Sequence, residues 1–430
     1  MSMHAIERPR FHARTWYRDA VGPPPPAAEI QPGACSADTV VIGAGLAGLS
    51  TAFELAARGA GKVMVLDGGG IAEGASGRNG GFVFAGYSLD PEALVDQLGA
   101  RRAAMLHGWT RAAVGTVRRR CAALGVSISD GEVVLADWFG DDERLAGFRR
   151  RMAELLDFRL EWMDRAELRR RLDSARYGAG LLEPGSFHFN PLAYAHALAA
   201  RIIELGGTVA TGAPAASLRR SAGRWRLSTP SGEIDARRVV LATGGYGRRL
   251  HRRLQRSVQP IATYIVVTEP LGDRLDACLP SGHAVYDTRF AFDYYRKLPD
   301  GRLLWGGRIS TADRRPGAVQ QLMRRDLARV FPALSGCRFD YAWGGWMSYA
   351  RHQMPILGEF EPGLWLALGF GGHGMAPTAL AGAVLAEAMT GDDQRLREFA
   401  AFGPVWAGGS AGRIAVQAVY WWKQLRDRLR

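Results

Sequence analysis

The chain has 430 residues, of which 47% are hydrophobic, and its formal net charge is +13. It is longer than one small core requires and apolar enough for a globular protein, so we expect two closely joined domains. No apolar run approaches the length of a transmembrane helix. Residues 1–18 carry scattered charges and no apolar h-region, which predicts no secretory signal. The four widely spaced cysteines fit a reducing cytoplasm.

The positive charge comes almost wholly from arginine, since the only lysines are Lys62, Lys297 and Lys423. Such an excess can attract nucleic acid, anionic lipid or an acidic partner. A compositional bias toward arginine is the simpler explanation, and no nucleic-acid-binding motif accompanies the charge. We therefore predict no nucleic-acid partner and no metal site, and peripheral contact with a membrane stays open.

Residues 1–37 form a surface arm that contains the extended run Pro23–Pro26. The β-branched run Thr39–Ile42 then predicts a buried strand, and Leu46–Ala57 predicts a helix. Between them lies G-x-G-x-x-G, and a second apolar run ends on an acid about 20 residues later, which is the dinucleotide-binding pattern. The candidate ligands of the nucleotide are Gly43, Gly45, Leu46, Ala47, Gly48 and Asp67. This pattern does not decide between FAD and NAD.

Two further glycine-rich stretches predict close approach of the backbone to the same ligand. The first is a loop rich in backbone donors, with candidates Gly74, Ser76, Arg78, Asn79, Gly80 and Gly81. In the second, an apolar strand breaks into Thr243 and Gly244. His188 lies in the turn 185–191 and is either a ligand or an ordinary surface histidine.

The middle of the chain predicts a helix over Pro91–Leu124 and a strand pair over Gly125–Ala136, with its turn at Asp130-Gly131. Aromatic residues follow on β-rich segments. We expect some of them to line a pocket for an aliphatic amine: Phe292, Tyr294, Trp305 and Trp346. The alternative is that most of these rings pack the core.

Near the C-terminal end, a strand enters the loop Gly369–Met375 and then a helix of small residues. The positive end of that helix points at whatever the loop binds. The candidates here are Gly371, Gly372, His373, Gly374 and Met375. Residues 416–430 form an amphipathic tail that contains Tyr420, Trp421 and Trp422.

The motifs together resemble the D-amino acid oxidase-like FAD-dependent oxidoreductases, and within them the gamma-glutamylputrescine oxidoreductase-like branch. The resemblance covers nearly the whole chain and is carried by Gly43–Gly48, G-A-S-G-R-N-G-G at 74–81, Y-Y-R-x-x-x-D-G-R-L-L-x-G-G-R at 294–308, G-F-G-G-H-G-M at 369–375 and W-W-K-Q-L-R-D at 421–427. It implies an α/β fold with two parts. The first is a discontinuous Rossmann-like FAD-binding domain of glutathione reductase type, over 38–90, 181–260 and 350–415. The second is an α+β substrate domain on a mixed antiparallel sheet, over 91–180 and 261–349.

The resemblance implies FAD rather than NAD, with the 43–48 loop on pyrophosphate, Asp67 on ribose and the 371–375 loop at the pyrimidine edge of the flavin. It also implies hydride transfer from an amine or amino-acid C–H to flavin N5, imine hydrolysis, and reoxidation by oxygen to give hydrogen peroxide. The residues expected near the reacting atoms are Arg296, Arg302, Arg351, His352 and His373.

Two departures from the family pattern stand out. Relatives often carry an acid in the segment 349–354, where this chain has Arg351 and His352, and this favours a carboxylated amine over a polyamine. Some relatives tether the flavin through a cysteine near this point. Here Cys337 comes several residues too early, so we predict non-covalent FAD. The alternatives are a dehydrogenase that passes electrons to quinone or a partner protein, and a flavoprotein that tailors a pathway intermediate. An NAD dehydrogenase fits least.

Overall fold

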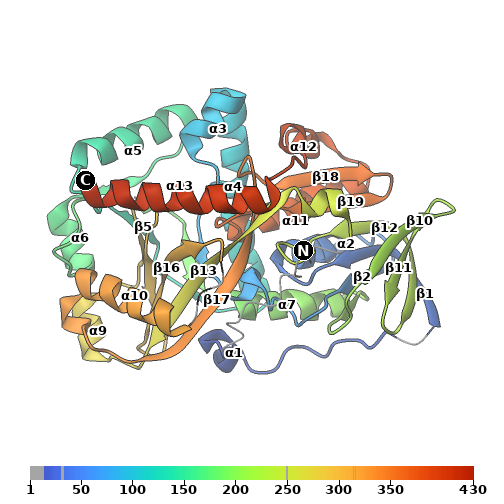
Figure 1. Ribbon diagram of the computed structural model, residues 1–430, viewed down its shortest axis with the longest axis horizontal. Coiled ribbons are helices and arrows are strands. Elements are labelled where there is room, and N and C mark those ends of the chain that lie inside the picture. The colour runs from blue at the N-terminus through green and yellow to red at the C-terminus, as the bar shows by residue number, and fades with distance from the viewer. Residues whose placement is uncertain (1–13, 31–32, 248–249, 313, 315) are drawn as a thin grey trace.

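The computed structural model describes residues 14–30, 33–247, 250–312, 314 and 316–430, and Figure 1 shows two large sheets with helices packed around them. The first sheet has a parallel centre in the order β9-β2-β1-β12-β19. Its strands are β1 (Gly33–Ile42), β2 (Val63–Leu66), β9 (Thr208–Ala210), β12 (Gly232–Leu241) and β19 (Leu364–Leu368). On the edge away from β1, strand β12 has two neighbours. Its first half pairs with β11 (Arg224–Thr229), and its second half pairs with β19. Strands β10 (Ser217–Ser221) and β18 (Ile356–Glu361) complete this sheet.

Both faces of the parallel strands are buried, which explains their continuous apolar sequences. Val41 and Val65 pack with the helices α2 (Leu46–Ala57), α7 (Pro191–Glu204) and α11 (Met375–Met389). Val40 and Met64 face the other way, into a core that includes Trp225. Helix α11 lies so close to α2 that a Cβ on Gly382 would come within 2.5 Å of the Ser50 carbonyl carbon.

The second sheet has the order β17-β13-β16-β15-β14-β5-β7-β6, and its only parallel pair is β14 with β5. Its strands are β5 (Val133–Ala136), β6 (Glu161–Met163), β7 (Gly180–Glu183), β13 (Val258–Thr268), β14 (Ala284–Asp287), β15 (Tyr294–Lys297), β16 (Leu303–Ser310) and β17 (Phe339–Ala350). Helices α6 (Arg165–Arg171), α9 (Asp273–Cys278) and α10 (Pro316–Val330) pack on one face. The two sheets meet where Tyr349 of β17 pairs with Phe370, just after β19. The predicted fold class is confirmed.

A small third sheet joins β3 (Phe82–Val83), β8 (Phe187–Phe189) and β4 (Ile128–Ser129). The remaining helices are α1 (Trp16–Val21), α3 (Pro91–Leu98), α4 (Ala100–Ala123), α5 (Asp142–Leu156), α8 (Arg252–Gln255), α12 (Gln394–Arg397) and α13 (Gly409–Leu429), with single 3-10 turns at Ala75–Gly77, Pro332–Leu334 and Ala400–Phe402. None of the helices in the described ranges is both long and apolar enough to cross a bilayer.

Three local expectations are wrong. The long helix over Pro91–Leu124 is two helices, because Gly99 at φ +77° ends α3 and starts α4. The strand pair over Gly125–Ala136 is no hairpin, since β4 pairs with β8 and β5 with β7 and β14. Gly131 instead packs on another loop, where a Cβ would lie 1.8 Å from the Gly282 oxygen.

The third wrong expectation is that the N-terminal arm lies on the surface. Its described part contains a buried helical turn. The Tyr17 side chain is fully buried, and its hydroxyl donates to the Asn79 carbonyl oxygen at 2.8 Å. The Trp16 indole donates to the Asp300 carboxylate at 2.7 Å. The arm therefore reaches one of the predicted ligand loops. Strand β7 pairs in the second sheet, although most of it falls in the range 181–260 predicted for the nucleotide domain.

Candidate functional site

A cavity of about 1340 Å³ lies between the two sheets, and its lining includes the turn after β1, the segment around Ala85 and Gly86, and helix α13. Pockets for drug-sized ligands are usually about 300–1,000 Å³. This cavity therefore has room for a large ligand and a smaller second one. Most of the predicted ligand residues line it: Gly43, Gly45, Leu46, Ala47, Asp67, Gly74, Ser76, Arg78, Asn79, Gly80, Gly81, Thr243, Gly244, Gly371, Gly372, His373, Gly374 and Met375.

The narrow turn after β1 requires glycine at each position of the motif. Gly43 has φ +115°, and a Cβ there would lie 2.4 Å from the Ala242 oxygen. A Cβ on Gly48 would lie 1.9 Å from the Gly43 oxygen, so this residue lets α2 pack on the strand. Gly45 is the N-cap of α2 and faces the cavity. The first-turn N–H groups of a helix have no intrahelical acceptor, which makes this end suitable for an anion.

Asp67 and Ser76 hold this turn in shape as well as line the cavity. One Asp67 oxygen accepts from the Ala44 amide at 2.7 Å, and the other accepts from the Gly69 amide at 2.7 Å. The Ser76 hydroxyl oxygen accepts from the Leu46 amide at 2.9 Å. These bonds fix the carboxylate beside the glycine turn, where it can also accept from a ribose hydroxyl.

The loop 74–81 is held by side chains that bond to its backbone. The Asn79 amide donates to the Ser76 oxygen at 2.8 Å, and its own oxygen accepts from the Gly81 amide at 2.8 Å. From outside the loop, Trp343 donates to the Arg78 oxygen at 3.0 Å and Arg296 donates to the Gly80 oxygen at 2.7 Å. The Asn79 side chain, which also lines the cavity, therefore holds the loop in shape.

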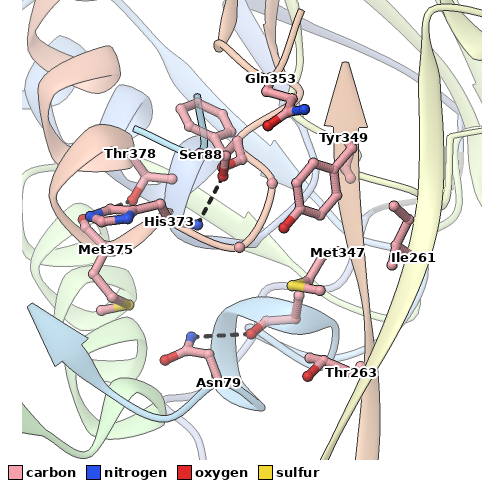
Figure 2. Close-up of a pocket in the computed structure, with 18 of the residues that line it drawn as sticks. Asn79, Ser88, Ile261, Thr263, Met347, Tyr349, Gln353, His373, Met375 and Thr378 are labelled. Atoms are coloured by element: carbon pink, nitrogen blue, oxygen red, sulfur yellow. Dashed lines mark hydrogen bonds between the residues drawn. The ribbon is translucent and has the colours of Figure 1, made fainter. Parts of the chain in front are cut away.

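The loop before α11 packs on β17, and Figure 2 shows it between Tyr349 and Met347 on one side and Met375 and Thr378 on the other. The His373 amide donates to the Ser88 hydroxyl at 3.2 Å. A Cβ on Gly372 would lie 2.7 Å from the Tyr349 hydroxyl, so a side chain cannot replace this glycine without moving the ring. Backbone and a helix N-terminus thus form this wall.

A second set of polar groups lies at the other end of the cavity, around Ala85 and Gly86. Glu183 at the end of β7 accepts from the Ala85 amide at 2.6 Å, and burial raises the pKa of its carboxyl to about 8. A Cβ on Gly86 would lie 3.6 Å from His373 Cε1 and 4.0 Å from His107 Nε2, so both imidazoles lie beside Gly86.

Both imidazoles are kept neutral, because burial lowers the pKa of His107 and of His373 to about 4. His107 Nδ1 and His373 Nε2 are buried and have no hydrogen-bond partner among the described residues. Apolar side chains surround this end of the cavity: Phe84, Val133, Leu135, Phe148, Met152, Phe158, Leu160, Leu181 and Tyr286. A ligand with its own donors would satisfy these atoms.

Two of the arginines that line the cavity have carboxylate partners. Arg289 pairs with Asp287 and Asp293 at 2.6 Å each, and Arg308 pairs with Asp326 at 2.5 Å. Arg351 also lines the cavity and is exposed. Lys423 of α13 also lines the cavity and is partly exposed, with its Nζ 4.1 Å from the Phe290 ring centroid. The cationic groups open to an anionic ligand are therefore near the solvent side of the cavity.

Five predicted site residues are not among those that line the cavity: Gly48, which lets α2 pack on the strand, and the four residues described next. Trp305 is fully buried and stacks on Tyr295 at 4.5 Å between ring centroids. His352 accepts from the Met354 amide at 3.2 Å and donates through Nε2 to the Gly403 oxygen at 3.1 Å.

The other two are arginines. Arg302 pairs with Asp300 at 3.0 Å and with Asp340 at 2.6 Å on the outside of the sheet. Arg296 is buried, with its donors on backbone oxygens and on the Tyr17 hydroxyl. Of the predicted aromatics, Phe292, Tyr294 and Trp346 do line the cavity.

The structure adds Glu183 and His107, which the sequence did not single out. Glu183 is the last residue of the apolar run G-L-L-E. An acid at the end of a buried strand is the sequence pattern that could have indicated a functional role. His107 is one polar residue inside the long helix α4, where the sequence does not show what the helix covers. His188 is structural, since its Nε2 donates to the Gly282 oxygen at 2.8 Å and burial lowers its pKa to about 3.

Comparison with known proteins fits this geometry. Residues 38–388 match the family model of FAD-dependent oxidoreductases known as DAO, so the chain belongs to that family, as its motifs predicted. It is 32% identical to the probable oxidoreductase OrdL of Haemophilus influenzae over 90% of both chains. It is 31% identical to gamma-glutamylputrescine oxidoreductase of Escherichia coli, over 91% of this chain and 93% of that one.

Among solved structures, glycine oxidase from Geobacillus kaustophilus superimposes with a TM-score of 0.71 at 21% identity, over 86% of this chain and 99% of that one. L-proline dehydrogenase from P. horikoshii gives 0.69 at 18% identity, over 84% and 98%. These likenesses confirm the fold, and the family confirms FAD as the cofactor.

The residues of the cavity fit FAD. Three glycine-rich turns and the N-termini of α2 and α11 line it, so backbone amides face a ligand where side chains would obstruct it. The volume exceeds that of a pocket for a single small molecule. None of the four cysteines lines the cavity.

Proposed function

We propose that the protein oxidises an amine at the carbon next to nitrogen, with FAD as the hydride acceptor and oxygen as the final oxidant. The observation that carries this proposal is the continuity of the cavity. One end has the glycine turn and helix N-terminus that suit a pyrophosphate, and the other has a buried carboxyl and two neutral imidazoles among apolar side chains. A dinucleotide and an amine can therefore lie in contact.

The chain's residues would divide between these tasks. The 43–48 turn and the N-terminus of α2 would hold pyrophosphate, and Asp67 would accept from the adenosine ribose. The 371–375 loop and the N-terminus of α11 would lie at the pyrimidine edge of the flavin, where their amides stabilise negative charge. When bound, FAD supplies the two-electron chemistry that no side chain can perform.

The amine end of the cavity favours an uncharged substrate nitrogen, which hydride loss requires. Burial and two neutral imidazoles disfavour a cation there, so an ammonium ion loses its proton on entering. The unpartnered Nε2 of His373 and the Glu183 carboxyl offer hydrogen-bond partners to the nitrogen. Phe84 and Tyr286, whose ring centroids lie 5.4 Å apart, would keep water from the reacting carbon.

The charges favour an amine whose far end is anionic. The buried Glu183 carboxyl is protonated at neutral pH and adds no negative charge, whereas the cations Arg351 and Lys423 line the cavity and are at least partly exposed. An ω-amino acid or an amide-linked amine with a remote carboxylate would place its amine near Glu183 and its carboxylate near the two cations. The gamma-glutamylputrescine oxidoreductase among the relatives is named for a substrate that contains both kinds of end.

An anaerobic substrate panel tests the proposal. Purified yellow protein is mixed without oxygen with primary amines, ω-amino acids, α-amino acids and amide-linked amines, and flavin absorbance is followed. We expect bleaching by an amine, faster when a remote carboxylate is present, and hydrogen peroxide after oxygen is admitted. Failure of every amine to bleach the flavin would refute amine oxidation and favour a tailoring role.

A second candidate is a dehydrogenase that delivers electrons to a quinone. It is favoured by the exposed aromatic surface of α13, whose inner face lines the cavity. Stopped-flow reoxidation separates the two. If the reduced enzyme does not react with oxygen but reacts rapidly with a soluble quinone, then quinone is the electron acceptor in place of oxygen.

A further inference from the structure

Helix α13 carries an unusual concentration of exposed hydrophobic side chains. Within the described chain, most of the exposed large hydrophobic residues lie in the segment 405–429: Val405, Trp406, Ile414, Val419, Trp421, Trp422, Leu425 and Leu429. The exposed fractions of Trp421 and Trp422 are 60% and 59%. Scattered apolar residues on a surface are ordinary, but a concentrated patch marks a binding surface.

These residues form one stripe along the helix. Ile414, Trp421, Leu425 and Leu429 recur at the spacings of one helical face, and Trp422 lies beside them. We call these five residues the outer stripe. Of the 21 residues of α13, only Tyr420 is buried. Figure 1 shows the helix, in red, running across the surface of the molecule with nothing drawn outside it.

The opposite face of α13 lines the cavity through Ala415, Val416, Val419, Tyr420 and Lys423. A few polar contacts hold this face in place. The Tyr420 hydroxyl accepts from the Ile309 amide at 3.0 Å, and the Asp427 carboxylate accepts from the Phe290 amide at 2.9 Å. The helix therefore has one face toward the cavity and the other toward solvent.

The charges beside the outer stripe are positive. Arg426 and Arg428 lie in the last turn, and no ion pair involving them is found in the described residues. The one acid of the helix, Asp427, is turned toward Phe290. Tryptophan flanked by arginine is the composition of helices that lie at an anionic membrane surface. Two copies of this helix placed face to face would bring like charges together, which disfavours self-association.

We propose that α13 docks the protein on an anionic lipid bilayer, with the outer stripe in the headgroup region and the cavity behind the helix. The rings of Trp421 and Trp422 enter the interface, and Arg426 and Arg428 contact lipid phosphates. The proposal does not depend on which amine is oxidised. It places the cavity next to the membrane, where an apolar electron acceptor or an amphiphilic amine is concentrated.

The test is co-sedimentation of FAD-loaded protein with vesicles of phosphatidylcholine alone or mixed with phosphatidylglycerol. We expect binding to the anionic vesicles, weak binding to the neutral ones, and a blue shift of tryptophan fluorescence. The W421S/W422S double variant should bind at least about tenfold more weakly, since it removes two large apolar groups from the interface. Its flavin absorbance and its melting temperature should match those of the parent, because both side chains are exposed.

A matched charge exchange separates specific docking from the general attraction of a basic protein. R426E/R428E should lose binding, whereas R219E/R220E, which makes the same charge change on the exposed strand β10, should keep it. Equal loss in the two variants would show that net charge alone draws the protein to lipid. Absence of binding to anionic vesicles, or a stable dimer by light scattering that the W421S/W422S variant dissociates, would overturn the proposal.

Discussion

The two ends of the cavity are built in different ways. At the nucleotide end the surface is mainly backbone, where Gly43, Gly45 and the loop 371–375 leave room for a ligand and helix N-termini face it. At the amine end the surface is side chain, contributed by α4, β7, β14 and the imidazole that His373 extends from the loop 371–375, and it depends on Glu183, His107 and His373. The first end is encoded by local spacing, and the second by tertiary packing.

This difference decides how each end responds to mutation. A substitution in the backbone-built end changes whether a ligand can fit at all, because the turn leaves no space for a side chain. A substitution in the side-chain-built end changes charge and hydrogen bonding but leaves the chain path intact. The following predictions test that contrast, beginning with the largest effect.

Gly45→Glu should yield protein without FAD. The new Cβ would lie 2.9 Å from the Ser76 hydroxyl oxygen, and the carboxylate would enter the space proposed for pyrophosphate. Like charges in contact cost several kcal/mol, which is a loss of at least about 100-fold in affinity. The measurement is flavin absorbance per protein after purification and after titration with FAD.

Gly115→Glu on α4 is the matched control. Its Cβ would meet only the far end of Arg119, at 3.4 Å, and it should keep its flavin. Yellow Gly45→Glu protein with parental affinity for FAD would contradict the placement of pyrophosphate at this turn.

Arg296→Met should lower stability more than it lowers the rate of flavin reduction. The substitution leaves the Gly80 and Phe189 oxygens without their donors in a buried site, at a cost of about 2–4 kcal/mol. Melting temperature and FAD affinity should fall together, since the loop 74–81 loses its support. The rate of anaerobic reduction in the FAD-loaded fraction should stay within about threefold of the parent. A collapse of that rate with unchanged stability would restore the catalytic role predicted from the sequence.

The aromatic positions show why the sequence located one end of the cavity and not the other. Tyr294 and Tyr295 are neighbours on β15 and must face opposite sides of the sheet. Tyr295 lies opposite Trp305, so those two rings share the core face, and Tyr294 lies opposite Gly306, where a Cβ would come within 2.1 Å of its ring. Predicting both Tyr294 and Trp305 as pocket residues was therefore inconsistent with the register, which the sequence alone does not give.

The prediction of the glycine turn did not depend on knowing the register between strands. Its ligand site is formed by residues adjacent in sequence, and Asp67 follows at the end of the next parallel strand. Arg296 and Arg302 were expected near the reacting atoms because the family resemblance implied it. Their partners are instead the Gly80 oxygen and the Asp340 carboxylate, each distant in the chain. Only tertiary structure reveals contacts of that kind.

Glu183→Gln should change how stability depends on pH. Burial raises the pKa of Glu183 from 4.5 to about 8, so between these values the folded protein holds a proton that the unfolded chain has released. The parent therefore loses stability as pH rises through this window, by up to about 1.4 kcal/mol per pH unit. Glutamine keeps the acceptor for the Ala85 amide but does not ionise.

We expect the melting temperatures of parent and Glu183→Gln to agree near pH 5 and to diverge toward pH 8, with the variant the more stable. The substrate-free, FAD-loaded proteins are compared by thermal unfolding across this range. Parallel curves would show that the Glu183 carboxyl is already ionised at neutral pH.

Arg302→Gln should have the smallest effect, although the sequence placed this residue among the catalytic candidates. Its guanidinium pairs with Asp300 and Asp340 near the surface, and exposed pairs of this kind contribute about 0–1 kcal/mol. The donation to the Thr268 oxygen at 2.8 Å adds a local contact within the sheet but none to the cavity. We expect kcat/KM and FAD affinity within about twofold of the parent and a slightly lower melting temperature. A loss of activity well beyond the loss of stability would mean that Arg302 acts on the cavity across the sheet, and the division between a backbone-built and a side-chain-built end would then be incomplete.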